Sequence, residues 1–327
     1  MRSINIYLSL FLISLLFSFN SCTTKSSAEH WIDNPTDKEI VINIDGTDIT
    51  IPAQSGINYN FEFGKHTLTY NGSSVNFMAK PPMMACIINP TQSNYIFYKN
   101  MYVNEADERA TESYMAWLKK QISSETTIIL NDSLQTMPLP FQIVNDLFIE
   151  EINYNWDYYL EETIPANVVL RDALVTKRNR SLADDPNYQA GKFQTVKSKI
   201  FRETEFLDYL KESGVEDNIQ FPKNIVRYEE LPKVKMATIN LDSIACPPGK
   251  EAVELALEHW DRLLTLKGTD FAKEYEIVSN LRHNVLTQSL EIRCEKEYDG
   301  DYSAKAAMTK VMKVTSSLSY LNFFIVE

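Results

Sequence analysis

The pattern of apolar and polar positions is clearest between residues 36 and 103. Isoleucines at positions 40, 42 and 44 alternate with other residues up to Asp45-Gly46, and the alternation resumes beyond that dipeptide. A second pair of alternating segments flanks Asn71-Gly72. Asp-Gly and Asn-Gly between alternating segments are a strong local signal of a β-hairpin, because both residues tolerate the positive φ of a tight turn. Residues 36–103 are therefore predicted to form an antiparallel, sandwich-like β-domain.

Helical spacing of apolar residues replaces the alternation further along the chain. It predicts a connecting helix within residues 104–125, and residues 126–231 are predicted to mix strands with one helix from Glu203 to Ser213. In residues 232–327 the predicted order is strand 234–241, helix 249–267, strands 275–280 and 288–297, helix 303–317 and strand 319–326. This βαββαβ order is that of a ferredoxin-like sandwich, although residues 270–281 are also compatible with a helix. The predicted fold class is α+β.

The start of the chain follows neither pattern. A basic residue at position 2 precedes an apolar run over positions 4–19, and the small residue Ser21 precedes Cys22. A basic start, a short apolar core and a small residue at the cut site are features of a secretory signal, and the run is shorter than the roughly 20 residues that cross a bilayer. We therefore expect residues 1–21 to be a signal peptide that is removed, and the polar residues 22–35 to form a tether.

The segment from Phe19 to Cys22 resembles the lipobox of bacterial lipoproteins, in which a small residue precedes a cysteine whose thiol receives a diacylglycerol. It departs from that pattern at Phe19, where leucine is usual, and ordinary secretion with an unmodified Cys22 is the alternative. The resemblance implies an anchor in the membrane of the cell envelope through acyl chains on Cys22. Bacteroidota-like lipoproteins displayed at the cell surface carry an acidic block after this cysteine, which is absent here. We therefore expect an outer-membrane anchor that faces the periplasm.

A second resemblance lies within the predicted β-domain. The strand and turn from Val41 to Gly46, the proline at position 52 and the tripeptide Gly64-Lys65-His66 are arranged as in PEGA-like envelope domains. The Gly-x-Thr-Pro step of that family is missing from this sequence. The resemblance implies a non-enzymatic module of surface and periplasmic proteins, with no catalytic residues to carry over.

The net charge and the cysteines restrict the partners and the redox chemistry. The chain has 44 acidic and 32 basic residues and a net charge of −12, which argues against nucleic acid as a partner. Besides Cys22 there are three cysteines, Cys86, Cys246 and Cys294, in a compartment that permits disulfides. We expect three unpaired thiols, with a disulfide between Cys246 and Cys294 as the alternative.

The sequence lacks motifs for cofactor, metal or nucleophile chemistry. The four histidines, at positions 30, 66, 259 and 283, do not have the paired spacing of zinc ligands, and neither a glycine-rich phosphate loop nor Gly-x-Ser-x-Gly occurs. Cys246 precedes a predicted helix but has no neighbouring base in the sequence and no Cys-x-x-Cys partner. No catalytic residue, cofactor or metal ligand is therefore predicted.

One segment combines aromatic residues with carboxylates. Trp156, Tyr158, Tyr159 and Glu161 are predicted to form a binding surface, because tyrosine and tryptophan supply contact area at little entropic cost. The alternative is a tethered periplasmic hydrolase of glycan or peptide that uses the carboxylates of Asp146, Glu150, Glu151, Asp157, Glu161 and Glu162. The sequence favours a lipid-anchored, non-catalytic envelope protein that binds another envelope protein or a saccharide.

Overall fold

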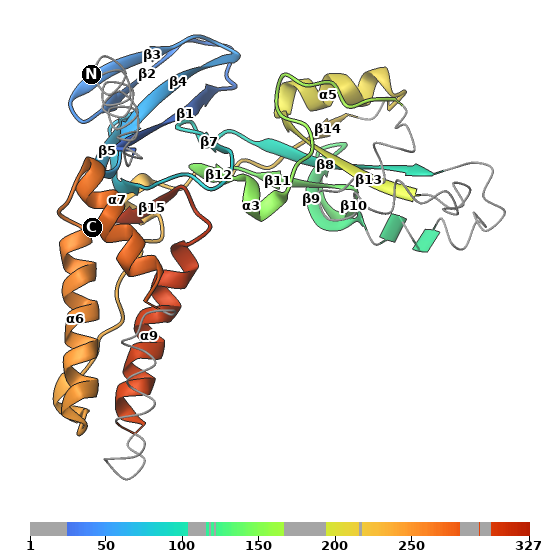
Figure 1. Ribbon diagram of the computed structural model, residues 1–327. Helices are drawn as coiled ribbons and strands as arrows, with labels where there is room; N and C mark the ends of the chain where they lie inside the picture. Colours follow the sequence, from blue (N-terminus) through green and yellow to red (C-terminus); the bar gives the residue numbers. More distant parts are fainter. Residues whose placement is uncertain are drawn as a thin grey trace, which may run out of the picture.

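The computed structural model describes residues 25–103, 116–117, 119–120, 122–166, 194–215, 218–281, 294 and 302–327. The expected signal peptide and Cys22 lie outside the described residues. The described chain is an α+β protein whose three parts meet at a corner (Figure 1). They are a pair of packed sheets, an arm of two further sheets with α5 (Glu203–Glu212), and an arm of helices α6 (Pro247–Leu263), α7 (Gly268–Ser279) and α9 (Ser303–Leu318). No helix within the described ranges is long and apolar enough to cross a membrane.

Two sheets pack face to face in the first part. The strand orders are β12-β7-β1-β4 in one sheet and β15-β6-β5-β2-β3 in the other. The first sheet contains β1 (Ser27–Asn34), β4 (Ser55–Glu62), β7 (Cys86–Ile88) and β12 (Phe148–Glu150). The second contains β2 (Ile40–Ile44), β3 (Thr47–Ile51), β5 (Gly64–Tyr70), β6 (Ser73–Ala79) and β15 (Phe323–Val326). Ile32 and Phe61 from the first sheet and Phe77 and Phe323 from the second lie in one buried cluster, so the sheets share a core.

Both predicted hairpins are present. Asp45 and Gly46 have φ angles of 52° and 86°, and Asn71 and Gly72 have φ angles of 50° and 78°. These paired positive values define the tight turns that join β2 to β3 and β5 to β6, and both strand pairs are antiparallel. The residues at positions 40, 42, 44 and 51 are buried, as the alternation predicts.

The expected tether 22–35 is corrected by the structure, because most of it is a strand. β1 pairs with β4 along its whole length and with β7 in parallel. Its last three residues, Ile32, Asp33 and Asn34, are fully buried. The segment contains few apolar residues, and its polar side chains are buried because they find hydrogen-bond partners in the fold, which composition alone does not reveal.

The second part is an arm of two three-stranded sheets, in the orders β11-β8-β13 and β10-β9-β14. Its strands are β8 (Tyr95–Val103), β9 (Ser124–Leu130), β10 (Ser133–Leu139), β11 (Phe141–Val144), β13 (Gln194–Arg202) and β14 (Ile219–Gln220). Helix α5 packs on these sheets through Phe206. In the predicted connecting helix 104–125, residues 116, 117, 119, 120 and 122 are helical, and β9 begins at Ser124.

The structure also corrects the boundary predicted at residue 103. Strand β8 lies inside the predicted β-domain 36–103, yet it pairs with β11 and β13 of the arm. Strand β15, at the C-terminal end, pairs with β6 of the first part. Both pairings join segments that are distant along the chain, and a pattern read along one strand does not identify its neighbour.

The ferredoxin-like order predicted for residues 232–327 is wrong. Residues 275–279 belong to helix α7, and Cys294, within the predicted strand 288–297, is helical. Residues 234–241 form no strand, although Val234 donates one backbone hydrogen bond to Ile325. Their alternating apolar side chains pack on the helices instead, which explains a strand-like pattern without a sheet.

The expectation of three unpaired thiols is also wrong. Cys246 and Cys294 form a disulfide with their Cα atoms 5.6 Å apart, and they lie in the core between α6 and α9. Cys86 is unpaired and buried in β7. Burial, together with the nearby carboxylate of Glu150, raises the pKa of the Cys86 thiol well above its usual value, so this thiol is unreactive.

Candidate functional site

The segment predicted to form a binding surface is partly buried in the structure. Trp156 is buried and Tyr159 is half-buried in the cluster between the first part and the arm. Tyr158 forms a β-bridge with Lys199, whose ammonium donates to the carbonyl of Tyr159 at 3.0 Å. Glu161 is exposed and forms an ion pair. The aromatic segment is therefore fastened against β13, because its large rings stabilise the core more than they would a solvent-exposed face.

The carboxylates proposed for a hydrolase each have a structural partner. Asp146 accepts from the Tyr154 hydroxyl, Asp157 from Ser198 and Lys197, Glu151 from the Ala85 amide, and Glu162 from the Tyr159 amide. Glu150 accepts from the backbone of Asn322 and Phe323. None of the six carboxylates lines either of the two cavities described below. The geometry therefore gives no support to a pair of carboxyls that face each other across a cleft.

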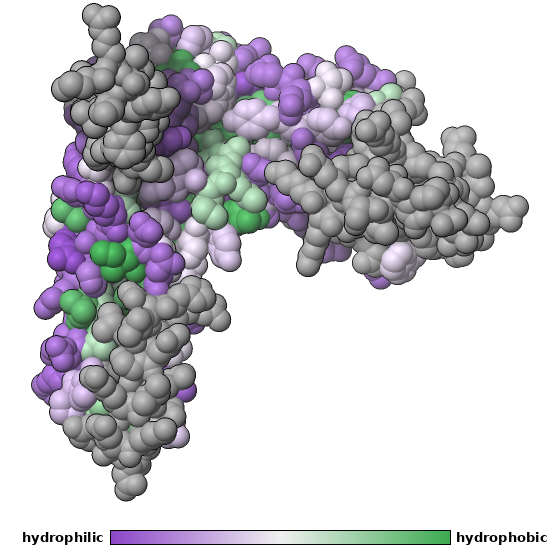
Figure 2. Space-filling model, viewed as in Figure 1, coloured by the Kyte–Doolittle hydropathy of each residue, from purple (hydrophilic) through white to green (hydrophobic). Residues whose placement is uncertain are grey.

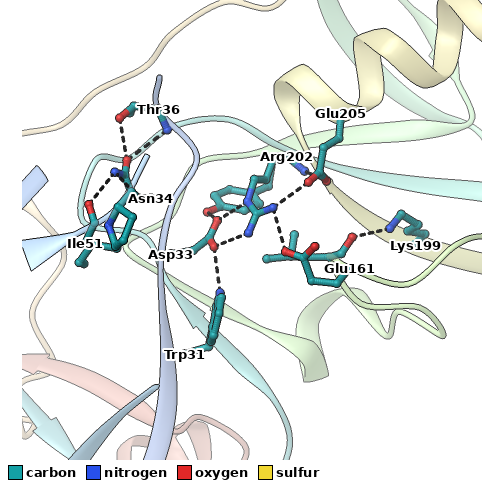
Figure 3. Close-up of polar contacts among 12 residues, drawn as sticks. Trp31, Asp33, Asn34, Thr36, Ile51, Glu161, Lys199, Arg202 and Glu205 are labelled. Carbon is teal, nitrogen blue, oxygen red and sulfur yellow. Dashed lines mark hydrogen bonds and ion pairs between the residues drawn. The ribbon is translucent and has the colours of Figure 1, made fainter. Parts of the chain in front are cut away.

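A buried ion pair joins the first part of the molecule to the arm (Figure 3). Nε and Nη2 of Arg202, the last residue of β13, donate to the two carboxylate oxygens of Asp33 in β1 at 2.8 and 2.7 Å. Nη1 lies 2.7 Å from Glu205 and 3.1 Å from Glu161. Burial alone would lower the pKa of Arg202, but the hydrogen bonds and charge of Asp33 raise it above its usual range. The Arg202 guanidinium therefore stays charged although it is buried.

Two aromatic donors complete the hydrogen bonding of Asp33. The Tyr95 hydroxyl donates to Oδ2 at 2.5 Å, and Trp31 Nε1 donates to Oδ1 at 2.9 Å. Burial and the neighbouring Asp33 carboxylate raise the pKa of Tyr95 well above its usual value, so its hydroxyl remains a donor. Strands β1, β8 and β13 are thus held at one carboxylate, which fixes the angle between the first part and the arm.

A groove of about 540 Å³ lies next to this ion pair, and we call it the junction groove. It is lined by the β5–β6 turn, by residues 90–94 before β8, by Lys223 and by residues 225–228. Asn94 and Glu203, the chain neighbours of Tyr95 and Arg202, also line it and are joined by a hydrogen bond of 3.0 Å. The volume is in the range of ligand-binding clefts.

Buried Asn34 shapes one edge of the junction groove (Figure 3). Its Nδ2 donates to the carbonyls of Lys38, Ile51 and Pro52 at 2.8, 3.2 and 3.0 Å. Its Oδ1 accepts from the amide and hydroxyl of Thr36, which lines the groove. The loop that carries Thr36 is therefore held in one conformation by a single side chain.

Gln92 holds the opposite wall of the junction groove. Its Nε2 donates to the carbonyl of Val226 at 2.7 Å, and its Oε1 accepts from the amide of Val226 at 2.8 Å. A residue presents its N–H and C=O on the same side only when it is extended, so the Gln92 amide takes the place of a neighbouring β-strand. Asn145 adds a hydrogen bond of 2.5 Å to the carbonyl of Asn224.

The other side of this extended segment is open. Neighbouring residues of an extended chain direct their N–H and C=O groups to opposite sides, so those of Ile225 point away from Gln92. Within the described residues the backbone of Ile225 forms no hydrogen bond, and its side chain is 69% exposed. Free backbone groups beside an exposed apolar side chain are what an added β-strand uses.

Charged residues hold the end of the same wall. Glu229 accepts from the Ser73 hydroxyl at 2.7 Å and from the Ser74 amide at 2.9 Å, and these hydrogen bonds lower its pKa to about 2. Arg227 lies 3.6 Å from Glu229. Lys223 adds a second positive charge to the lining of the groove. The wall is thus fastened to β6, with cationic side chains exposed along it.

The three histidines that the structure describes do not assemble into a site. His30 and His66 are buried in the first part, His259 lies 2.6 Å from Glu274, and His283 lies outside the described residues. In the ranges that the structure describes, no group of three or more His, Cys, Asp or Glu residues could hold a metal ion.

Sequence reasoning missed the residues of the junction groove. Gln92 and Val226 are 134 positions apart, so their pairing has no local signal. The signal that was available is the apolar pair Ile225-Val226 between polar residues and without a helical or strand pattern. Comparison of the chain with models of known protein families, with curated proteins and with solved structures found no match in any of the three.

Proposed function

We propose that this chain is a lipid-anchored, non-catalytic protein of the cell envelope that binds an extended segment of another envelope protein in the junction groove. The open backbone edge at Ile225, held extended by Gln92, is the observation that carries the binding role. The sequence around Cys22 and the resemblance of residues 41–66 to PEGA-like domains support the envelope location and a non-enzymatic module. The expected position is the outer membrane, facing the periplasm.

A polypeptide suits the junction groove better than a saccharide does. Main-chain pairing at an open edge gives affinity for any extended segment, and Ile225 and Val226 offer apolar contact to its side chains. Lys223 and Arg227 favour a segment that carries acidic residues. A saccharide site would instead use exposed aromatic rings, but of the predicted ones Trp156 is buried and Tyr158 and Tyr159 are half-buried.

A photo-crosslinking amino acid placed at position 225 is expected to form a protein adduct in intact cells. The matched control is position 134, because Leu134 is equally exposed at 69% and lies on β10 of the arm, in a different sheet. Mass spectrometry of the digested adduct should identify peptides of one envelope protein at position 225 and none at position 134. A glycan adduct at position 225 would show that the ligand is a saccharide rather than a polypeptide. Equal adducts at both positions would exclude the junction groove as the binding site.

Replacing Cys22 by serine is expected to move the protein from membrane fractions to the soluble periplasmic fraction, because the acyl chains would have no attachment point. Incorporation of labelled palmitate should disappear in the variant. The folded body should be unchanged, since the substitution lies before the first described strand. Membrane retention or palmitate labelling of the variant would exclude a lipid anchor at this cysteine.

A further inference from the structure

The fold begins very soon after the proposed lipid attachment site. The carbonyl of Ser26 accepts a hydrogen bond of 2.8 Å from the amide of Phe63, which fixes the chain from that point on. Three residues, 23–25, separate Cys22 from Ser26. A fully extended chain of this length spans about 14 Å between the two Cα atoms. The body is therefore held next to its anchor.

A large cavity opens at this end of the chain. It measures about 1050 Å³ and is lined by residues 25–29 together with Pro82 and Tyr275, among others. Gly268, the first residue of α7, donates to the carbonyl of Phe63 at 2.7 Å, which joins the helical arm to the same corner. Lys25, Glu29 and Glu276 give the rim charges of both signs.

An exposed apolar loop adjoins this cavity. Residues 82–85 are all exposed, and Met83 and Met84 are 62% and 43% exposed. Fully buried Asn322 holds the backbone of both: its Oδ1 accepts from the Met83 amide at 3.0 Å, and its Nδ2 donates to the Met84 carbonyl at 2.9 Å. Figure 2 shows pale green, apolar surface gathered in the corner between the two arms. The loop is therefore rigid at its backbone and exposed at its side chains.

We propose that the cavity rim and residues 82–85, together the anchor face, rest on the phospholipid bilayer, with Met83 and Met84 in the interfacial layer. The inference rests on the proposed lipidation of Cys22. Single exposed apolar residues need no explanation, but Met83 and Met84 lie next to each other beside the cavity. Residues 25–29, which follow the proposed lipid attachment site, line the same cavity. Methionine side chains adapt to an irregular apolar surface, and a rim with both signs of charge suits zwitterionic headgroups.

The test uses the natural lipidated protein in vesicles of phosphatidylethanolamine and phosphatidylcholine. A Met83→Cys variant supplies a single labelling site, because Cys86 is buried, Cys246 and Cys294 form a disulfide, and Cys22 carries the lipid. An environment-sensitive fluorophore at this position should shift to shorter wavelength on vesicles and be quenched several-fold by spin-labelled lipid. The same label at Leu134→Cys, on the arm, should show neither effect. Met84→Cys repeats the measurement if the first variant does not fold.

Each outcome separates the inference from the proposal on which it rests. Quenching at position 83 or 84 without quenching at position 134 supports the anchor face. If the labelled protein floats with the vesicles and no position is quenched, the anchor holds and the anchor face is wrong. Equal quenching at all positions also overturns the anchor face, since contact would then be unspecific. If the protein carries no lipid and does not float with the vesicles, the proposed lipidation of Cys22 is wrong, and the anchor face, which depends on it, is wrong as well.

Discussion

Replacing Arg202 by alanine is expected to lower the free energy of unfolding by about 3–5 kcal/mol, because the variant leaves a buried carboxylate without its counter-charge. Asp33 is fully buried and receives two of its four hydrogen bonds from this guanidinium. Urea denaturation followed by tryptophan fluorescence measures the effect close to its source, since Trp31 donates to the same carboxylate.

Two further variants test whether the cost comes from the unpaired buried charge. Lys211→Ala removes an ion pair with Asp208 in which both side chains are exposed, so it should change the stability by less than about 1 kcal/mol. The double variant Asp33→Leu with Arg202→Met removes both charges and should recover part of the loss. A double variant that is less stable than Arg202→Ala would contradict this explanation. It would mean that the intact ion pair stabilises the junction, and that the loss in Arg202→Ala does not come from the unpaired charge of Asp33.

Elements whose contacts are close along the chain could be predicted from the sequence. The two hairpins follow from Asp45-Gly46 and Asn71-Gly72, since each dipeptide supplies both positive φ angles of its turn. Helices α5 and α9 begin at Glu203 and Ser303, the residues where apolar positions take up helical spacing. In each case the residues that decide the structure lie within a few positions of one another.

Pairings between distant segments could not be predicted in this way. Strand β15 completes a sheet through contacts of Phe323 with Ala79, and nothing in either segment identifies the other. The polar composition of residues 22–35 predicts a tether rather than strand β1. Asp33 and Asn34 of that strand are nevertheless buried, because they hydrogen-bond to partners elsewhere in the chain. Burial of a polar residue depends on those partners and not on its own hydropathy.

The predicted ferredoxin-like order failed for a related reason. An alternating apolar pattern shows only that one face of an extended segment is covered, and residues 234–241 are covered by helices rather than by a second layer of a sheet. The residues of the junction groove are harder still to predict from the sequence. The side chain of Gln92 alone forms the two hydrogen bonds to the Val226 backbone that a neighbouring strand would otherwise form. Of the predicted surface, Glu161 is exposed and is an ion-pair partner of Arg202.

Glu150 is the site of the second large expected effect, because it joins β12 in one sheet of the first part to the C-terminal strand β15 in the other. Its carboxylate accepts from the amides of Asn322 and Phe323 at 2.7 and 3.1 Å and from Asn322 Nδ2 at 2.8 Å. Burial raises the pKa of Glu150 to about 7, although the two amides oppose this shift. As the pH rises, the unfolded chain releases the proton of Glu150 near its pKa of 4.5, whereas the folded protein keeps this proton until the pH approaches about 7.

Replacing Glu150 by alanine is expected to cost about 3 kcal/mol at pH 7.5, because three buried donors lose their acceptor. The raised pKa means that the stability contributed by the bound proton is complete below pH 4.5 and is lost as the pH rises through 7. The difference between wild type and variant should thus be larger at pH 5 than at pH 7.5, by about 2 kcal/mol. Urea denaturation of both proteins across this range measures it.

The comparison of wild type with variant removes the contribution of groups that do not interact with Glu150. Burial lowers the pKa of His30 to about 4, and this histidine is present in both proteins. Burial lowers the pKa of Lys80 to about 8 and the charge of Glu150 opposes that shift, so the response of Lys80 is part of the measured difference. Glu151→Ala is the matched control, since this neighbouring carboxylate accepts one amide hydrogen bond at the surface and should cost less than about 1 kcal/mol. A difference that is independent of pH would show that Glu150 is ionised throughout, so that its hydrogen bonds outweigh its burial.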